Sequence, residues 1–337
     1  MFAFALSDEE RLIQDTARRF ARDRLLPGVR AHERARGVPR ELAREFAGLG
    51  LDAAQVGAFA RALVLEELAA VDPGATVALD GLGPARDVLA EAGLEEPPRE
   101  PGSRGVVIDD VDGHLHVRDG RLAGEHPWVP ADTLAVVVVL HAAGASVVRE
   151  GWRLTPITAC GLEAAGAARI ELDGAPIAAT VTDGRRLARA RAHMRTSVAA
   201  LLVGAARGAH QYAMRYATER TAFGRPIAHH QALAFLIADL ATAVDVARLA
   251  AWRAAAVLDR GDTAEWEAAS ALAEAAEQAL FVGPNAVQIL GGHGFMKDHP
   301  VEKWMRDIRT LAQLAGGRDE AELAAAALAP GHGVGLR

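Results

Sequence analysis

Cysteine is almost missing from this sequence, which has one, Cys160, among 337 residues. A single cysteine excludes an internal disulfide and a cysteine-rich metal site, and we expect Cys160 to be a small core residue. The chain also lacks an excess of positive charge, because 37 lysines and arginines face 44 acidic residues, for a net charge of −7. Binding of nucleic acid through a basic surface is therefore not predicted.

Long apolar runs are missing as well. No run reaches the roughly 20 residues of a membrane-spanning helix, and the apolar start at residues 1–6 is too short for a signal peptide. We expect no membrane span and a cytoplasmic location. The sequence has no phosphate-binding loop, nucleophile elbow or dinucleotide-binding glycine motif. No metal site is predicted, because His229 and His230 are consecutive and would point apart on a helix.

The residues that are present predict a mainly helical protein with a small β domain. Hydrophobic residues make up 50% of the chain and charged residues 24%, as in ordinary soluble domains. Ser7 and Glu10 form a capping box that begins a first helix, which Pro27 and Gly28 should end; Pro39 should begin another. We expect three domains: a helical N-terminal domain at 1–100, a shortened β domain at 103–182 and a C-terminal four-helix bundle at 185–330. The bundle helices are predicted at 191–218, 229–259, 264–283 and 300–313.

The β domain is predicted from short β-branched runs separated by turn signals. A Pro/Glu-rich linker at residues 95–102 precedes it. Asp-Gly pairs, which favour tight hairpins, stand at 112–113, 119–120, 173–174 and 183–184. These features predict a small β-barrel or sandwich.

The most specific stretch of the chain is residues 285–317, NAVQILGGHGFMKDHPVEKWMRDIRTLAQLAGG. A helix should end at Gly291-Gly292, and Pro300 should open a new helix on which Glu302–Arg306 and Lys303–Asp307 can pair. Alone, a Gly-Gly-x-Gly turn indicates only a helix break. The whole string resembles the C-terminal signature of the acyl-CoA dehydrogenase family, as does a second motif at residues 216–231 and the opening of the chain.

The resemblance implies the acyl-CoA dehydrogenase fold, FAD as cofactor and an acyl-CoA as substrate. In the family the matching residues reach the FAD of a neighbouring subunit. Here these cofactor-binding candidates are Arg220, Phe223, Gln231, Gln288, Gly291 and Gly292. A guanidinium such as that of Arg220 pairs bidentately with pyrophosphate oxygens, and Gln288 and the two glycines offer an amide and bare backbone N–H groups. The alternative is that Arg220 only pairs with Glu219 or a helix-end carbonyl.

The catalytic carboxylate of the family is missing from both places where members carry it. Ala315 and Met194 occupy these positions, so no catalytic base is predicted. Arg195 matches an arginine of the family's active-site wall and is a substrate-side candidate, although an exposed helix-face arginine is the plainer interpretation. His193 should point to another face of its helix, and His293 should pack or line the glycine loop.

The middle part of the chain also departs from the family. The family's flavin- and thioester-binding segment has no counterpart between Gly93 and Gly113. The flavin-facing strand of the family has only an echo at Trp128-Val129-Pro130, where Trp128 can equally be a core anchor.

These features together predict a subunit that gives FAD-binding residues to a partner. The partner would be a full-length homologue with an intact Glu, in an α2β2 heterotetramer acting in lipid metabolism. Bacterial members built in this way oxidise bulky, sterol-derived acyl-CoA side chains. Two alternatives remain open: an independent flavoenzyme with altered chemistry on a non-CoA substrate, and an FAD-free homologue that is not an enzyme. The sequence also leaves open whether the oligomer is homomeric or heteromeric.

Overall fold

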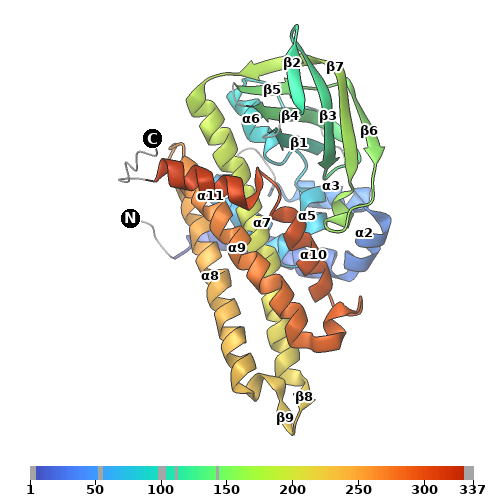
Figure 1. Cartoon of the computed structure of the whole chain (residues 1–337), viewed down its shortest axis with the longest axis vertical. Helices are drawn as coiled ribbons and strands as arrows, with labels where there is room; N and C mark the ends of the chain where they lie inside the picture. Colours follow the sequence, from blue (N-terminus) through green and yellow to red (C-terminus); the bar gives the residue numbers. More distant parts are fainter. Residues whose placement is uncertain (1–4, 52–55, 98–103, 111–112, 142–143, 330–337) are drawn as a thin grey trace.

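The computed structural model describes residues 5–51, 56–97, 104–110, 113–141 and 144–329. Figure 1 shows three long helices that run side by side along the molecule, a β region at one end, and shorter helices beside them. The chain is therefore mainly helical with a small β region, as the sequence predicted.

Short helices make up the described N-terminal part. They are α1 (Asp8–Phe20), α2 (Val29–Ala35), α3 (Arg40–Gly48), α4 (Ala58–Ala69), α5 (Pro73–Leu79) and α6 (Ala85–Glu91). The capping box is confirmed, since Ser7 Oγ accepts from the Glu10 amide and the Glu10 carboxylate accepts from the Ser7 amide. Pro39 caps α3 as expected.

The predicted stop at Pro27 and Gly28 is wrong. After α1 the chain continues through a π-helical turn, Ala21–Leu25, and a 3-10 turn, Leu26–Gly28, into α2. Pro27 lies at the start of the 3-10 turn, where its missing N–H costs little.

The strands form a curved sheet in which β7 is shared between two sides. The strands are β1 (Arg104–Asp109), β2 (Leu115–Arg118), β3 (Arg121–Val129), β4 (Leu134–His141), β5 (Gly144–Val148), β6 (Trp152–Pro156) and β7 (Ala168–Val181). Their order is β1-β4-β5-β7-β3-β2, with β6 also paired to β7. The β1–β4 pair is parallel and the other pairs of this sheet are antiparallel.

The predicted Asp-Gly turns have different outcomes. The pair at 119–120 joins β2 to β3 as a hairpin, with positive φ at both residues. The pair at 173–174 lies inside β7, where the register with β3 shifts, so it makes an irregularity and not a hairpin. Asp183 instead caps the next helix by accepting from the Arg186 amide. Of the pair at 112–113, the aspartate lies outside the described residues.

The C-terminal part is built on long helices. These are α7 (Gly184–Glu219), α8 (Gln231–Asp259) and α9 (Glu265–Leu290), followed by α10 (Val301–Leu311) and α11 (Gly317–Leu328). The helix predicted to stop at residue 283 runs on through Pro284 to Leu290. Packing against α10 supports this segment. Gly283 lies so close to α10 that an added Cβ would be only 3.3 Å from Met305 Cα.

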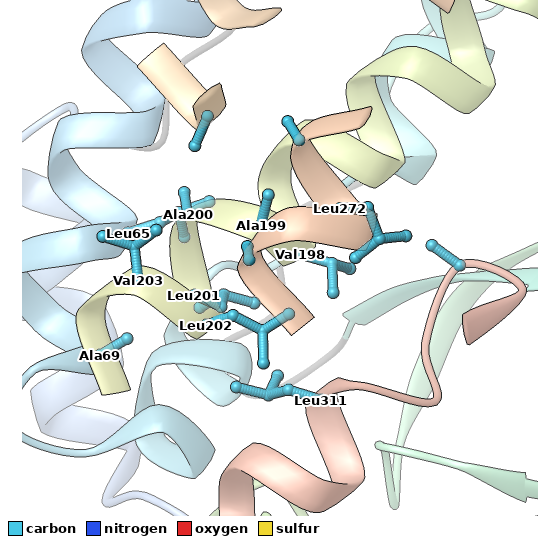
Figure 2. Close-up of a cluster of buried hydrophobic side chains, with 14 of the residues drawn as sticks. Leu65, Ala69, Val198, Ala199, Ala200, Leu201, Leu202, Val203, Leu272 and Leu311 are labelled. Atoms are coloured by element: carbon cyan, nitrogen blue, oxygen red, sulfur yellow. The ribbon is translucent and has the colours of Figure 1, made fainter. Parts of the chain in front are cut away.

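Small residues let α7 lie against α4. A Cβ on Gly204 would come within 2.5 Å of the Glu66 carbonyl oxygen, and one on Gly208 within 2.2 Å of the Ala70 carbonyl oxygen. Beside this crossing, leucine, valine and alanine side chains from α4, α7, α9 and α10 fill the main core, shown in Figure 2. The bundle is thereby joined to the N-terminal helices.

Two expected core residues differ in their environment. Cys160 is exposed, so the prediction of a buried cysteine is wrong; it lies in the irregular segment before Leu162. Trp128, near the end of β3, is partly buried and packs against the main core. Most of the predicted linker, from residue 98 onward, lies outside the described residues.

Candidate functional site

A buried ion network fixes the helix that follows the glycine turn. Lys303 Nζ is 2.7 Å from Asp72 Oδ1 and 2.6 Å from Asp307 Oδ2. Asp307 also accepts from the Leu162 amide at 2.7 Å. Burial opposes the charge of Lys303, but the two carboxylates outweigh it and raise its pKa. The sequence predicted the Lys303–Asp307 pair but gave no signal for Asp72, which lies 231 residues away.

The structure brings the best-matched cofactor candidates into one open groove. The groove has a volume of about 500 Å³ and lies where α7 ends and the glycine turn follows α9. Its wall includes Arg220, Gln288, Gly291 and Gly292, together with Tyr216 and His293. Residues that are 68 or more positions apart in the sequence thus share one surface.

Arg220 is exposed where α7 ends, and only its backbone is engaged there. Its amide donates to the Tyr216 carbonyl, and its carbonyl accepts from the Ile227 amide. Within the described residues its guanidinium makes no ion pair or hydrogen bond, so the alternative of a pair with Glu219 or a carbonyl has no support. A free guanidinium in a groove is suited to an anionic ligand.

The glycine turn leaves room for a ligand. Gly291 has a φ of 59°, and nothing lies within 4 Å of a Cβ added to Gly291 or Gly292. The Gly291 amide, however, donates to the Gln288 carbonyl. The expectation that this N–H is free is therefore wrong, and Gly291 contributes shape to the groove.

Phe223 and Gln231 do not line the groove in the single chain. Phe223 keeps 95% of its surface exposed and has a φ of 52°, at the tip of the hairpin between β8 (Thr221–Ala222) and β9 (Arg225–Pro226). Its ring meets His230 edge-on, with centroids 6.0 Å apart. Gln231 is exposed as the first residue of α8. An exposed phenylalanine in a left-handed conformation is unusual, and such strain tends to occur at functional positions.

Two tyrosine–histidine pairs beside the groove were missed by the sequence reasoning. Tyr216 Oη lies 2.6 Å from His293 Nδ1, and Tyr212 Oη lies 2.8 Å from His299 Nδ1. The two imidazoles stack with centroids 5.6 Å apart. His293 therefore lines the groove, as expected, and it is also held in place by Tyr216. The helical spacing of the two tyrosines was the available signal.

The two positions that the resemblance assigns to the family's base are both buried in this chain. Met194 and Ala315 retain only 4% and 8% exposure. Arg195 is also buried, at 6%, so its interpretation as an exposed helix-face arginine is wrong. Its nearest acid is Glu320, at 3.9 Å, and its Nε has no hydrogen-bond partner among the described residues. Burial lowers the pKa of Arg195.

Two acidic side chains, Asp109 and Glu320, lie near the turn that contains Ala315. Glu320 Cγ would be 3.0 Å from a Cβ on Gly316, and the Glu320 carboxylate is the one beside Arg195. A Cβ on Gly316 would be 3.5 Å from Oδ2 of Asp109, which stands at the end of β1. Burial raises the pKa of Asp109, although Arg191, with Nε 3.8 Å away, partly opposes this. The sequence contained no motif that could have indicated Asp109.

Other candidate chemistry is limited. His193 lies 3.6 Å from Asp87, and burial lowers its pKa. Across the described part of the chain, no group of three or more histidine, cysteine or acidic residues is arranged to hold a metal ion. Among the helices described, none is both long and apolar enough to cross a membrane.

Comparison with known proteins agrees with the fold and the motifs. The family model "Acyl-CoA dehydrogenase, C-terminal domain" matches residues 183–328, and "Acyl-CoA dehydrogenase, N-terminal domain" matches residues 7–96. This chain belongs to the acyl-CoA dehydrogenase family. Members of this family are oxidoreductases.

Individual relatives match this chain over different shares of its length. The benzylmalonyl-CoA dehydrogenase of Aromatoleum aromaticum is 28% identical, over 94% of this chain and 96% of its own length. An acyl-CoA dehydrogenase of Bacillus subtilis is 40% identical, but over 41% of this chain and only 36% of its own length.

Solved structures share the fold. The Tcur3481-Tcur3483 steroid ACAD has a TM-score of 0.84 at 24% identity, covering 95% of this chain and 97% of the solved one. A glutaryl-CoA dehydrogenase from Mycobacterium smegmatis, in complex with FADH2, has a TM-score of 0.81 at 18% identity, covering 97% and 96%.

Proposed function

We propose that this chain is a subunit of an FAD-dependent acyl-CoA dehydrogenase that helps to hold the FAD of a neighbouring subunit. The observation that carries the proposal is the unpaired, exposed Arg220 facing an open glycine turn. The groove fits a dinucleotide pyrophosphate, because it combines a free guanidinium, the Gln288 amide and uncrowded backbone. FAD, when bound, would accept the hydride removed from the β-carbon of the acyl thioester.

Each residue of the groove has a distinct part in this proposal. Arg220 would pair with the pyrophosphate through its planar fork of donors. Gln288 would add a hydrogen bond, and the absence of side chains at Gly291 and Gly292 would allow the ligand to approach the backbone. Phe223, exposed at the hairpin tip, and Gln231 would contact the same cofactor from outside the groove, once a neighbouring subunit covers them.

The residues at this chain's own candidate catalytic positions favour the proposal that another subunit supplies the base. Alanine and methionine cannot take the α-proton, and a positioned base typically contributes a rate factor of roughly 10²–10⁴. Ala315, Met194 and Arg195 are all buried, so little of this wall is open to a thioester. The base would therefore come from a partner subunit with its Glu intact.

The partner would be a full-length homologue, and the assembly an α2β2 heterotetramer. The similar fold of the two-component Tcur3481-Tcur3483 steroid ACAD is compatible with this arrangement. A bulky, sterol-derived acyl-CoA is the proposed substrate class.

The test is to purify the chain alone and together with the homologue encoded nearest to it. We expect the isolated chain to show no acyl-CoA desaturation with an artificial electron acceptor, and the complex to bind FAD and turn over. Light scattering should show at least a dimer. Turnover by the chain alone would refute the supporting role, and a failure to bind FAD with any encoded partner would favour the FAD-free alternative.

The position of Asp109 favours a second candidate, an independent flavoenzyme with altered chemistry. Its raised pKa suits a general base, since proton transfer is most efficient when the pKa approaches the working pH. Stoichiometric FAD in the isolated chain, with turnover that Asp109→Asn abolishes while FAD remains bound, would select this function. An active Asp109→Asn variant would exclude Asp109 as the base.

A further inference from the structure

A second cavity opens between the N-terminal helices and α7. Its volume is about 700 Å³, and it shares no lining residue with the groove around Arg220. The end of α1, the π-helical turn Ala21–Leu25 and α2 form one wall, and α4, α7, α10 and the chain before α10 form the rest. The size is that of a site for a small organic molecule.

The floor of this cavity is apolar. It is lined by Ala21, Leu26, Val29, Ala70, Val71 and Trp304. Trp304 is buried, and its indole N–H has no acceptor among the described residues. The indole ring therefore adds apolar surface to the cavity, while its N–H is covered by the protein.

Cations surround the apolar floor, and two of them have no counter-ion. Arg18 and Arg207 both pair with Glu67, and Arg22 pairs with Asp23 next to it. Arg30 pairs with Glu33 on its own helix and with Glu302 of α10. Arg215 and Lys297 are exposed and make no ion pair within the described chain.

One acid of the lining, Asp298, is likewise without an ion pair within the described residues. The unpaired lining groups thus carry two positive charges and one negative charge, on a protein whose net charge is −7. A positive mouth on an acidic protein attracts anions.

We propose that this cavity binds an amphipathic organic anion, with its apolar body on the floor and its anionic group between Arg215 and Lys297. The ligand class is a carboxylate or phosphate carried on an aliphatic or aromatic body. The site requires neither FAD nor a partner subunit, so it stands independently of the function proposed above.

The test is calorimetric titration of the whole chain with octanoate, octanol and inorganic phosphate. Octanoate supplies both the body and the charge, octanol the body alone and phosphate the charge alone. We expect octanoate to bind best, and its affinity to fall with added salt. Each of Arg215→Ala and Lys297→Ala should weaken octanoate by about two- to fivefold, as for exposed ion pairs, and Leu26→Glu should weaken it further by repulsion.

A matched control is Arg260→Ala at the far end of α8, which removes an exposed arginine that has no ion pair in the described part of the chain. It should leave octanoate binding unchanged. The proposal is overturned if octanoate does not bind at millimolar concentration, or if octanol or phosphate binds equally well. It is also overturned if Arg215→Ala and Lys297→Ala together have no more effect than Arg260→Ala.

Discussion

Lys303 holds a buried positive charge between two carboxylates, Asp72 and Asp307. Burial alone would raise the pKa of Asp72, but attraction to Lys303 and hydrogen bonds hold it below its ordinary value. Asp72 therefore stabilises the fold above its unfolded pKa, and this stability is lost as the pH falls through the lower, folded pKa. The natural protein should lose this contribution below about pH 4.

Lys303→Met should reverse this dependence. With no cation between them, the pKa of Asp72 would rise, and that of Asp307, which burial already raises, would rise further. The variant should therefore become more stable as the pH falls from 7 toward 5. At pH 7 we expect a loss of roughly 3–5 kcal/mol, as for a broken buried ion pair. Urea unfolding at both pH values measures this, with the exposed Lys297→Met as control. A loss below 1 kcal/mol, or an unchanged pH slope, would contradict the assigned network.

Ala315→Glu tests the proposal that Ala315 stands where the family carries its base. Ala315 has a φ of 58° and is buried near Asp109, so a glutamate there would meet backbone strain and a neighbouring carboxylate. We expect the isolated Ala315→Glu chain to show no acyl-CoA desaturation, because the sequence between Gly93 and Gly113 also has no stretch that resembles the family's flavin-binding segment. Activity gained from this single change would show that the base is the only missing part.

At the scale of elements, the α4–α7 crossing depends on Gly208. An added methyl group would meet the Ala70 carbonyl oxygen at 2.2 Å, which a backbone atom can relieve only by moving the helices apart. Gly208→Ala should therefore destabilise the protein by about 1–3 kcal/mol despite the higher helix propensity of alanine.

Gly184→Ala, on the same helix, is the matched control. Nothing lies within 4 Å of a Cβ at Gly184, so this change should be neutral or slightly stabilising. Thermal unfolding of both variants measures the difference. Equal melting temperatures would mean that the helices do not cross as closely as described.

Helix ends that are marked by capping residues, proline or glycine nearby in the chain could be predicted from the sequence. The capping box at Ser7, the α3 start at Pro39 and the helix end at Gly291 each depend on neighbouring residues, and all three are found. The Asp-Gly pair at 173–174 does not form the predicted hairpin, because β7 continues through it and its register with β3 shifts there. The run of α9 through Pro284 was missed because its support comes from α10, which no local pattern reveals.

At the scale of the whole molecule, the candidate site was only partly predictable. Motif matching selected Arg220, Gln288, Gly291 and Gly292, and these residues share a groove. It did not reveal that the Gly291 amide is already bonded, that Arg195 is buried, or that Asp109 lies near the Ala315 turn. These facts depend on contacts between segments that are far apart in the chain. In the proposed assembly, the exposed Phe223 and Gln231 would belong to a surface that a neighbouring subunit completes.

The most direct test of the shared cofactor is the FAD affinity of the complex with Arg220 changed. Loss of a charge-assisted pair is worth roughly 1.5–3 kcal/mol, so Arg220→Ala should weaken FAD binding about tenfold to a hundredfold. Arg220→Lys should recover only part of this, because an ammonium lacks the planar fork. Arg260→Ala, which changes an exposed arginine at the far end of α8 and outside the groove, is the control and should bind FAD normally. Unchanged FAD affinity in Arg220→Ala, with the complex intact, would contradict the account.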